Sequence, residues 1–216
     1  MIDAKVLEQA KKSIVDQDKD KAVKIAEEVI AKGEENPMEL MNEAFIPGIN
    51  EVGDLFGRGQ LFLPELMQAA NAMKAVTDII NDALPENVEK QRGGVIVMAT
   101  VKGDVHDIGK CIVVSLLRAN GFTVHDIGRD IDTEMIIEEA VKVDADIIGT
   151  SALLTTTMVR QKDLEAELKK AGLRERFKTM VGGAPVTTRW ASRIGADAYA
   201  EDAQDAVKKV KELLRK

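Results

Sequence analysis

The chain has 216 residues, and 45 % of them are hydrophobic, which suffices for the cores of two compact domains. Its formal net charge is −7 at pH 7. Its apolar runs fall far short of the roughly 20 residues that cross a bilayer, and it begins Met-Ile-Asp-Ala-Lys without an apolar leader. We therefore expect a cytoplasmic protein with no membrane partner. The single cysteine, Cys111, excludes an internal disulfide and a cysteine-rich metal site.

The negative charge is concentrated in the N-terminal part of the chain. Residues 1–90 contain 10 basic and 18 acidic side chains, whereas residues 91–216 contain 20 and 19. An acidic half disfavours nucleic-acid binding, which needs a basic face to neutralise phosphates. The excess charge is compatible with a solvated helical surface or with a docking face for another protein, and both interpretations stay open at this point.

Four helices are predicted in the first 83 residues. Asp18 can cap the exposed amides of the second helix, and Gly33 can end it in a left-handed conformation. Pro37 and Pro64 suit a first helical turn, where a missing N–H is no loss. The helices are expected at about 3–15, between Asp18 and Gly33, from Pro37 onward, and from Pro64 to near Leu84.

The polar and aperiodic stretch 86–93 is the predicted linker, which gives a helical domain at 1–90 and a second domain at 91–216. From Gly94 onward, short β-rich runs alternate with segments of helical period. Five strand–helix repeats predict an α/β fold with a doubly wound, Rossmann-like (flavodoxin-like) parallel sheet covered on both faces, and ligands bind beyond the carboxyl ends of such strands. The five strands are expected at 95–100, 123–127, 147–151, 179–182 and 198–200.

The loop after the first predicted strand contains Gly103 and, six residues later, Gly109-Lys110. A Walker phosphate loop would need four residues between these glycines instead of five, and Cys111 stands where Ser or Thr should bind magnesium. The Gly-x-Gly-x-x-Gly fingerprint of dinucleotide-binding domains is also absent. The loop offers His106 between two aspartates instead.

Asp104 and His106 are two residues apart, so in an extended loop the carboxylate can accept a hydrogen bond from one imidazole nitrogen. The other nitrogen is then fixed as a lone-pair donor, as in many metal-binding histidines. One histidine is a poor site for a bare metal ion but is adequate as axial ligand of a macrocycle that brings its own equatorial nitrogens. A structural or merely exposed His106 is the alternative that the spacing leaves open.

Hydroxyls and paired glycines follow the third and fourth predicted strands. Ser151 is followed by Thr155, Thr156 and Thr157, and the fourth strand ends in Gly182-Gly183. Paired glycines allow a bulky ligand to approach the backbone, although a tight turn explains them equally well.

Taken in order, Asp104-x-His106-x-x-Gly109, Ser151-x-Leu153 and Gly182-Gly183 resemble the signature of cobalamin-binding Rossmann-like domains. The run Val52-Gly53-Asp54-Leu55-Phe56-Gly57-x-Gly59-x-x-Phe62-Leu63-Pro64 resembles the four-helix cap of methionine synthase and of the corrinoid proteins that serve methylamine and methanol methyltransferases. The similarity covers nearly the whole chain.

The resemblance implies that His106 is the lower axial ligand of cobalt in cobalamin or a related corrinoid, cycling between methylcob(III)alamin and cob(I)alamin. It implies that Asp104 and then Ser151 form a relay behind His106 that couples coordination to proton uptake. Positions similar to those that line the cofactor's nucleotide tail are Gly109, Ser151, Thr155, Gly182, Gly183 and Ala203. The remaining cofactor-binding positions that the resemblance implies are Gly103, Val105, Asp107 and Leu153.

Phe56, Leu63 and Leu66 match cap positions that lie over the upper face of the corrin in related proteins. They are also ordinary candidates for the core of the helical domain, and the two roles are compatible. His125 opens a second His-Asp-Ile-Gly, on or just after the second predicted strand, which we interpret as coincidence.

The function that the resemblance implies is that of a methyl carrier, a subunit that is not catalytic alone. One partner would be a substrate:corrinoid methyltransferase, with a methylamine or quaternary amine as the expected donor. The second would be a methyltransferase acting on coenzyme M or tetrahydrofolate, and a third a reductive activation protein. The alternatives are the small subunit of an adenosylcobalamin mutase, which lacks a helical cap, and a cobalamin-dependent sensor or regulator, which commonly adds a basic DNA-binding module.

Overall fold

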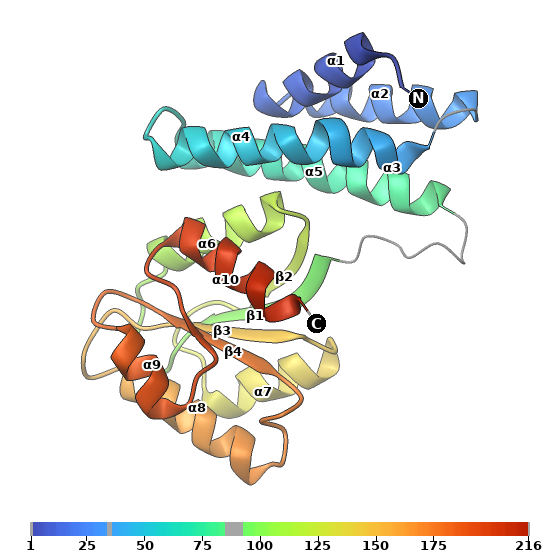
Figure 1. The fold of residues 1–216 in the computed structure, drawn as a ribbon. Helices are drawn as coiled ribbons and strands as arrows, with labels where there is room; N and C mark the ends of the chain where they lie inside the picture. Colours follow the sequence, from blue (N-terminus) through green and yellow to red (C-terminus); the bar gives the residue numbers. More distant parts are fainter. Residues whose placement is uncertain (1, 34–35, 85–92, 216) are drawn as a thin grey trace. The chain divides into compact units, whose positions relative to one another are not determined.

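The computed structural model describes residues 2–33, 36–84 and 93–215 (Figure 1). It divides into two compact units, one of Met1–Gly93 with Arg118–Gly121 and one of Gly94–Leu117 with Phe122–Lys216. The predicted linker, apart from Gly93, and the predicted boundary between 90 and 91 lie outside the described residues. No helix within the described ranges is both long and apolar enough to span a membrane.

The first unit is helical, and its helix boundaries follow the expected signals. The carboxylate of Asp18 accepts a hydrogen bond from the Lys21 amide at 3.0 Å, and Gly33 ends the second helix with φ of +66°. Pro37 and Pro64 lie in the first turns of their helices, as predicted. The helices of this unit are α1 (Ala4–Val15), α2 (Lys19–Lys32), α3 (Pro37–Leu40), α4 (Ile46–Gly57) and α5 (Leu63–Ala83).

One feature of this unit departs from the expectation of a single third helix. Between α3 and α4 the backbone makes a π-helical turn, η1 (Met41–Phe45). Pro47 in the first turn of α4 has no N–H to donate to the carbonyl one α-helical turn earlier, so the preceding turn widens instead of continuing as α-helix. The third predicted helix is therefore one rod with a wide turn in its middle.

The helices of the first unit pack pairwise, α2 along α5 and α1 along α4. Gly48 allows the closest approach, because a Cβ atom there would lie 2.9 Å from the Lys11 carbonyl and 3.1 Å from the Ile14 Cβ. Fully buried apolar side chains fill the space between the rods. Among the largest are Ile14, Leu40, Met41, Phe45, Ile49, Leu66 and Ile80.

The second unit is a parallel five-stranded sheet with strand order β2-β1-β3-β4-β5, the flavodoxin-like order of a doubly wound fold. The α/β prediction is confirmed, and each strand lies within two residues of its expected position. The strands are β1 (Gly93–Thr100), β2 (Phe122–Asp126), β3 (Ile147–Ser151), β4 (Lys178–Gly182) and β5 (Ala198–Tyr199).

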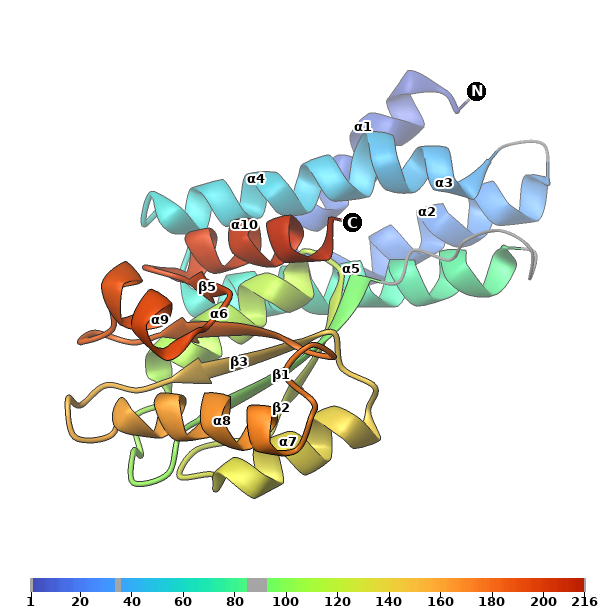
Figure 2. The same ribbon diagram turned by 60° about the horizontal axis from the view of Figure 1, so that its bottom comes forward.

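Helices cover both faces of this sheet, α6 and α10 on one face and α7 and α8 on the other (Figures 1 and 2). The α7/α8 face buries a continuous core with β1 and β3, built around Val97, Ile148, Leu164 and Phe177. The helices are α6 (Ile108–Ala119), α7 (Thr133–Lys142), α8 (Val159–Lys170), α9 (Thr188–Ile194) and α10 (Ala203–Leu214).

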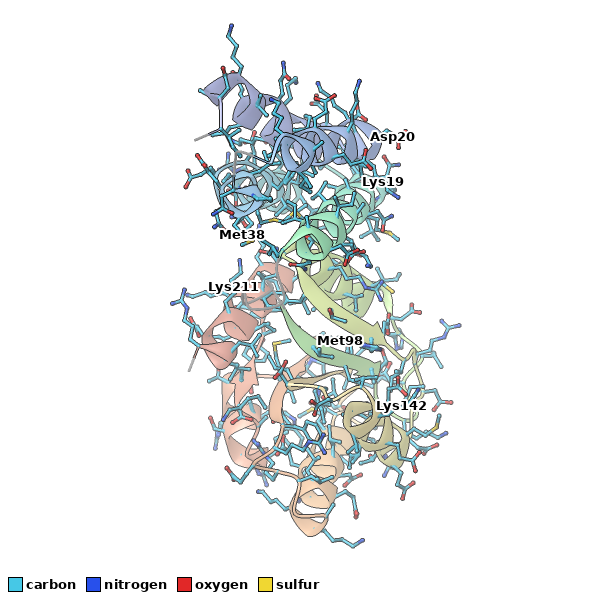
Figure 3. The ribbon with its side chains drawn as sticks, turned by 90° about the vertical axis from the view of Figure 1, so that its right-hand side faces the viewer. Lys19, Asp20, Met38, Met98, Lys142 and Lys211 are labelled. Atoms are coloured by element: carbon cyan, nitrogen blue, oxygen red, sulfur yellow. The ribbon has the colours of Figure 1, made fainter. Side chains whose placement is uncertain are left out.

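A methionine covers a glycine on the neighbouring strand. Met98, labelled in Figure 3, pairs with Gly149 of β3, and a Cβ atom on Gly149 would lie 2.2 Å from the Met98 sulfur. Gly149 is therefore explained by the packing of Met98 across the sheet, without reference to a ligand.

Two buried polar networks hold the ends of the sheet. Near the start of β4, the Arg174 guanidinium contacts Glu165 at 2.6 Å and Asp197 at 2.8 Å and also donates to the Phe177 and Gly195 carbonyls. At the carboxyl ends of β3 and β4, the buried Gln161 amide donates to the Thr150 and Gly182 carbonyls, each at 3.1 Å. Its oxygen accepts a hydrogen bond of 3.1 Å from the indole N–H of Trp190.

Candidate functional site

His106 lies in the loop of residues 101–107 at the carboxyl end of β1, where a doubly wound sheet binds its ligands. Its Nδ1 is 2.8 Å from Asp104 Oδ1, and its backbone N–H donates to the same oxygen at 3.1 Å. The Thr100 hydroxyl donates to the His106 carbonyl at 3.1 Å. The predicted pairing of His106 with Asp104 is therefore present, and both the ring and the backbone of His106 are held.

Asp104 is completely buried, and its second oxygen is also occupied. Oδ2 accepts hydrogen bonds from the Thr157 hydroxyl at 2.6 Å and the Leu153 amide at 2.7 Å. Burial alone would raise the pKa of this carboxyl, but the hydrogen bonds from Thr157, Leu153 and His106 hold the pKa well below its usual range. Asp104 is thus an ionised acceptor that keeps a proton on His106 Nδ1.

The opposite edge of the His106 ring is available to a ligand. The side chain is 49 % exposed, and among the described residues Nε2 has no hydrogen-bond partner. With the proton assigned to Nδ1 by the contact to Asp104, Nε2 presents a lone pair, the form that binds a metal.

Exposed apolar side chains come from the two loops that meet at His106. Val105 and Ile108 flank it in sequence, and Leu153 and Leu154 follow β3 in the segment that contacts Asp104. Exposed large aliphatic residues next to a polar ligand atom are unusual on a solvated surface. A flat, largely apolar macrocycle ligated through its centre would cover such residues, so these side chains fit a corrinoid.

The hydroxyl expected behind Asp104 comes from a different residue. The relay was predicted to run from Asp104 to Ser151, but in the described part of the chain Ser151 makes no hydrogen bond to Asp104 and Thr157 occupies that position. Ser151 is the last residue of β3, whereas a turn after the strand brings Thr157 back over the buried carboxylate. In the sequence, Thr157 stood out only as one of three consecutive threonines. The turn that brings Thr157 to Asp104 depends on the tertiary fold.

The glycines of the site fall into two groups. A Cβ atom on Gly109 would meet nothing within 4 Å, and one on Gly103 would come no closer than 3.7 Å to Thr157. In contrast, a Cβ atom on Gly183 would lie 1.8 Å from the Ala152 carbonyl oxygen, and φ at Gly183 is +122°. Gly183 is thus required by the approach of two backbone segments, whereas no packing of the protein requires a glycine at position 109.

The other residues singled out from the sequence are more scattered. Asp107 contacts Arg129 at 3.6 Å, Thr155 is exposed after β3, and Ala203 opens α10. In the helical unit Leu66 is fully buried, while Phe56 and Leu63 are half-buried. Their contacts with a cofactor remain predictions. His125 lies within β2, 3.9 Å from Glu139, and takes no part in the His106 loop.

Comparison with known proteins identifies the family. Residues 94–208 and residues 6–81 each match a family described as "B12 binding domain", which indicates cobalamin or corrinoid binding. The dimethylamine corrinoid protein 1 of Methanosarcina acetivorans is 54 % identical over 85 % of this chain and 86 % of its own length. The dimethylamine corrinoid protein of Methanosarcina barkeri is 50 % identical over 97 % of both chains.

A solved structure extends the match to three dimensions. The methanol:cobalamin methyltransferase complex of Methanosarcina barkeri contains a chain that is 30 % identical, with a TM-score of 0.81, over 98 % of this chain and 80 % of that one. The fold, the histidine loop and the sequence matches agree: the chain belongs to the B12-binding family that includes the methylamine corrinoid proteins.

Proposed function

We propose that the chain is a methyl carrier that binds a corrinoid through His106 and serves two methyltransferases in turn. The observation that supports this most directly is the free Nε2 of His106, at an exposed apolar surface, with Nδ1 fixed by a buried carboxylate. When bound, the corrinoid supplies a cobalt centre that accepts and releases a methyl group.

In this proposal each residue behind the metal has a stated task. His106 would hold the cobalt through the lone pair of Nε2, and Asp104 keeps the proton on Nδ1 and the ring in one orientation. Thr157 donates to Asp104 and so fixes the carboxylate that orients the ring. We assign to Thr157 the hydroxyl position that the sequence suggested for Ser151.

The same residues allow ligation to be coupled to a proton. A proton and a metal would use the same lone pair of His106 Nε2, while Nδ1 stays 2.8 Å from the Asp104 carboxylate in this structure. Coordination of His106 is therefore expected to weaken with acidification, because metal and proton compete for one lone pair.

The nucleotide tail of the cofactor is proposed to lie along residues at the carboxyl ends of β1, β3 and β4. The space around Gly109 leaves room for it. The assignment of the other positions follows the family resemblance: Ser151, Thr155, Gly182, Gly183 and Ala203.

The partners are proposed from the relatives. Corrinoid proteins work with methyltransferases, as in the methanol:cobalamin methyltransferase complex. Because relatives that span most of this chain are named dimethylamine and trimethylamine corrinoid proteins, we propose a methylated amine as the donor. A second methyltransferase acting on coenzyme M or tetrahydrofolate, a reductive activation protein and a cytoplasmic location complete the proposal.

The mutase subunit and the regulator receive less support. Small mutase subunits lack a helical cap, whereas residues 6–81 match a B12-binding family of their own. The acidic N-terminal part does not suit a DNA-binding regulator.

Reconstitution with hydroxocobalamin tests the cofactor site. The wild type should bind about one corrinoid per chain, because one histidine supplies the axial ligand. The bound cofactor should show a base-off, histidine-on visible spectrum. His106→Ala should lose that spectrum. His125→Ala, which removes the histidine of the second His-Asp-Ile-Gly run, within β2, should keep it. Equal spectra for the wild type and His106→Ala would overturn the assignment of the ligand.

The donor is tested separately. Purified methyltransferases for dimethylamine, trimethylamine and methanol are each incubated with the same reduced corrinoid protein, and methylation of the cobalt is followed by absorbance. Transfer by an amine enzyme is the expected result. Transfer by the methanol enzyme alone would contradict the proposed donor and leave the carrier function intact.

A further inference from the structure

The segment of residues 127–132, between β2 and α7, runs beside the His106 loop (residues 101–107). Backbone hydrogen bonds join the two where β1 ends: the Thr100 amide donates to the Gly128 carbonyl at 2.9 Å, and the Ile131 amide donates to the Thr100 carbonyl at 3.1 Å. Val101 and Ile131 form a parallel bridge. The two segments thus stay paired beyond the end of β2, as far as Val101 in the His106 loop.

Asp130 contacts the His106 loop on its N-terminal side. Its carboxylate accepts a hydrogen bond from the Gly103 amide at 2.8 Å, and its own amide donates to the Asp104 carbonyl at 3.0 Å. The two contacts fix the backbone on either side of the residue that orients His106. Lys102 adds an exposed ion pair with Asp130 at 3.7 Å, which is weak in water.

Asp130 makes these contacts from an uncommon backbone conformation. Its φ is +56°, in the left-handed region, which few non-glycine residues adopt, although aspartate and asparagine do so more often than most. Gln17 and Asp144 also have positive φ and lie outside the His106 site, so what distinguishes Asp130 is its contacts with Gly103 and Asp104. A glycine at this position would fold more easily but would lack the acceptor for Gly103.

Arg129 contacts the same loop immediately beside His106. Its guanidinium donates to the Val105 carbonyl at 3.3 Å and lies 3.6 Å from the Asp107 carboxylate. The residues before and after His106 are therefore bridged by one side chain. Arg129 is 58 % exposed, so its effect is on loop geometry more than on the stability of the fold.

We propose that Asp130 is a positioning residue for His106, with Arg129 in a supporting role on the other side of the histidine. Through Gly103 and Asp104, Asp130 sets the loop geometry in which Asp104 meets His106 Nδ1. The inference rests on the proposed corrinoid ligation by His106. Its first testable consequence is the tautomer of the His106 ring, which is measured in the protein without cofactor.

The test compares Asp130→Gly, which accepts the positive φ and removes the side-chain acceptor, with Asp130→Asn, which retains an acceptor oxygen and tolerates the same φ. Lys102→Met is the matched control, because it removes only the exposed ion pairs of Lys102, with Asp130 and with Asp132 at 3.1 Å. In the cofactor-free protein, ¹⁵N NMR of the His106 ring should show Nδ1–H in the wild type, in Asp130→Asn and in Lys102→Met. Asp130→Gly should show a mixture of the two tautomers.

The second readout is hydroxocobalamin binding. Asp130→Gly should bind about tenfold more weakly or worse, the loss typical of partners that orient a metal-binding histidine, and show a smaller base-off fraction. Asp130→Asn and Lys102→Met should stay within about threefold of the wild type on the same scale. Arg129→Met, whose exposed side chain carries little folding risk, should change the spectrum in the same direction as Asp130→Gly by a smaller amount.

The outcomes separate the two proposals. If the wild type binds with the histidine-on spectrum and Asp130→Gly matches it in both readouts, the role of Asp130 is overturned while the carrier function stands. Equal impairment of Asp130→Asn and Asp130→Gly would also overturn the role of the hydrogen bond. If the wild type binds no corrinoid, the proposed function fails, whereas the tautomer of His106 still decides the role of Asp130.

Discussion

At the scale of single residues, two glycines of the site have different physical reasons for being glycine. Gly183 has a φ of +122°, and its α-carbon faces the Ala152 carbonyl so closely that any side chain would overlap it. Gly109 lies in the first turn of α6 with open space around its α-carbon. The family resemblance implies cofactor contacts for both, but the packing of the protein alone explains Gly183 and does not explain Gly109.

We therefore expect opposite effects of alanine at these positions. Gly183→Ala should lower the free energy of unfolding of the cofactor-free protein by about 3 kcal/mol or more, because it combines backbone strain with an overlap. Gly109→Ala should stay within ~1 kcal/mol of the wild type or be more stable, because alanine favours a helix, and should still weaken corrinoid binding. Urea unfolding and a hydroxocobalamin titration measure the two effects. A stable Gly183→Ala protein would contradict the close backbone approach.

The Thr157 hydroxyl provides the second test at this scale. Thr157→Val keeps the shape but leaves the buried, ionised Asp104 without one of its donors, which should cost about 1.5–3 kcal/mol in urea unfolding of the cofactor-free protein. Ser151→Ala should cost less than ~0.5 kcal/mol, because the Ser151 hydroxyl bonds to none of the described residues. Thr157→Ser serves as the conservative control. A larger loss in the free energy of unfolding for Ser151→Ala than for Thr157→Val would show that Ser151 is the hydroxyl that stabilises Asp104.

The sequence predicted the part of the site that depends on short spacing and missed the part that depends on tertiary turns. Asp104 and His106 meet because they are two residues apart in one loop. Thr157 reaches Asp104 from 53 positions away, and Asp130 reaches Gly103 from 27 positions away. No periodicity or motif encodes such distances, so these contacts became visible only with the fold.

At the scale of elements, the helices and strands were predictable wherever a cap, a proline or a strand pattern marked their ends. The π-helical turn η1 was not, although its cause stands in the sequence as Pro47. A proline near the start of α4 was compatible with a new helix or with a kink in a continuous one. Which of the two forms depends on how the helices of this unit pack against one another.

The buried network of Arg174 makes a prediction about the sheet. Arg174→Met leaves the buried Glu165 without its cation and Asp197 with the more distant Lys178, at 3.9 Å, so the expected loss in the free energy of unfolding is about 3–5 kcal/mol. Arg160→Met is the matched control, because the ion pair of Arg160 with Asp163 is exposed on both sides and should contribute less than ~1 kcal/mol. Urea unfolding of the wild type, Arg174→Met and Arg160→Met measures these losses. Equal unfolding midpoints would show that the network at the start of β4 does not stabilise the sheet.

At the scale of the whole molecule, the lowered pKa of Asp104 links stability to pH. Burial alone would raise that pKa, but the hydrogen bonds of Thr157, Leu153 and His106 bring it below the ordinary aspartate value of about 3.9. The unfolded chain then binds more protons than the folded one as the solution becomes acidic. The stabilisation is complete above about pH 4 and is lost as the pH falls toward the folded value.

The predicted outcome is a difference between two proteins. Between pH 5 and pH 3 the free energy of unfolding of the wild type should fall more steeply than that of Asp104→Asn, by up to ~1.4 kcal/mol per pH unit. The other carboxylates titrate in both proteins and cancel in the comparison. Parallel pH profiles would mean that Asp104 is not preferentially ionised in the folded state.

The doubly wound α/β architecture was predictable because five strand–helix repeats admit few other arrangements. The loop-to-loop contact between residues 127–132 and the His106 loop follows from the strand order, since β2 and β1 are neighbours and their following loops lie together. Propensities describe the two loops separately, which is why the individual hydrogen bonds between them could not be predicted from the sequence.

The hydrogen bond between Gln161 and Trp190 has a practical consequence for experiments in solution. The chain contains one tryptophan, so its intrinsic fluorescence comes from a single indole whose N–H is held by the amide that joins the ends of β3 and β4. Unfolding breaks the contacts of Gln161 and is expected to change this emission. The protein therefore carries an optical reporter beside the carboxyl ends of β3 and β4, which requires no label.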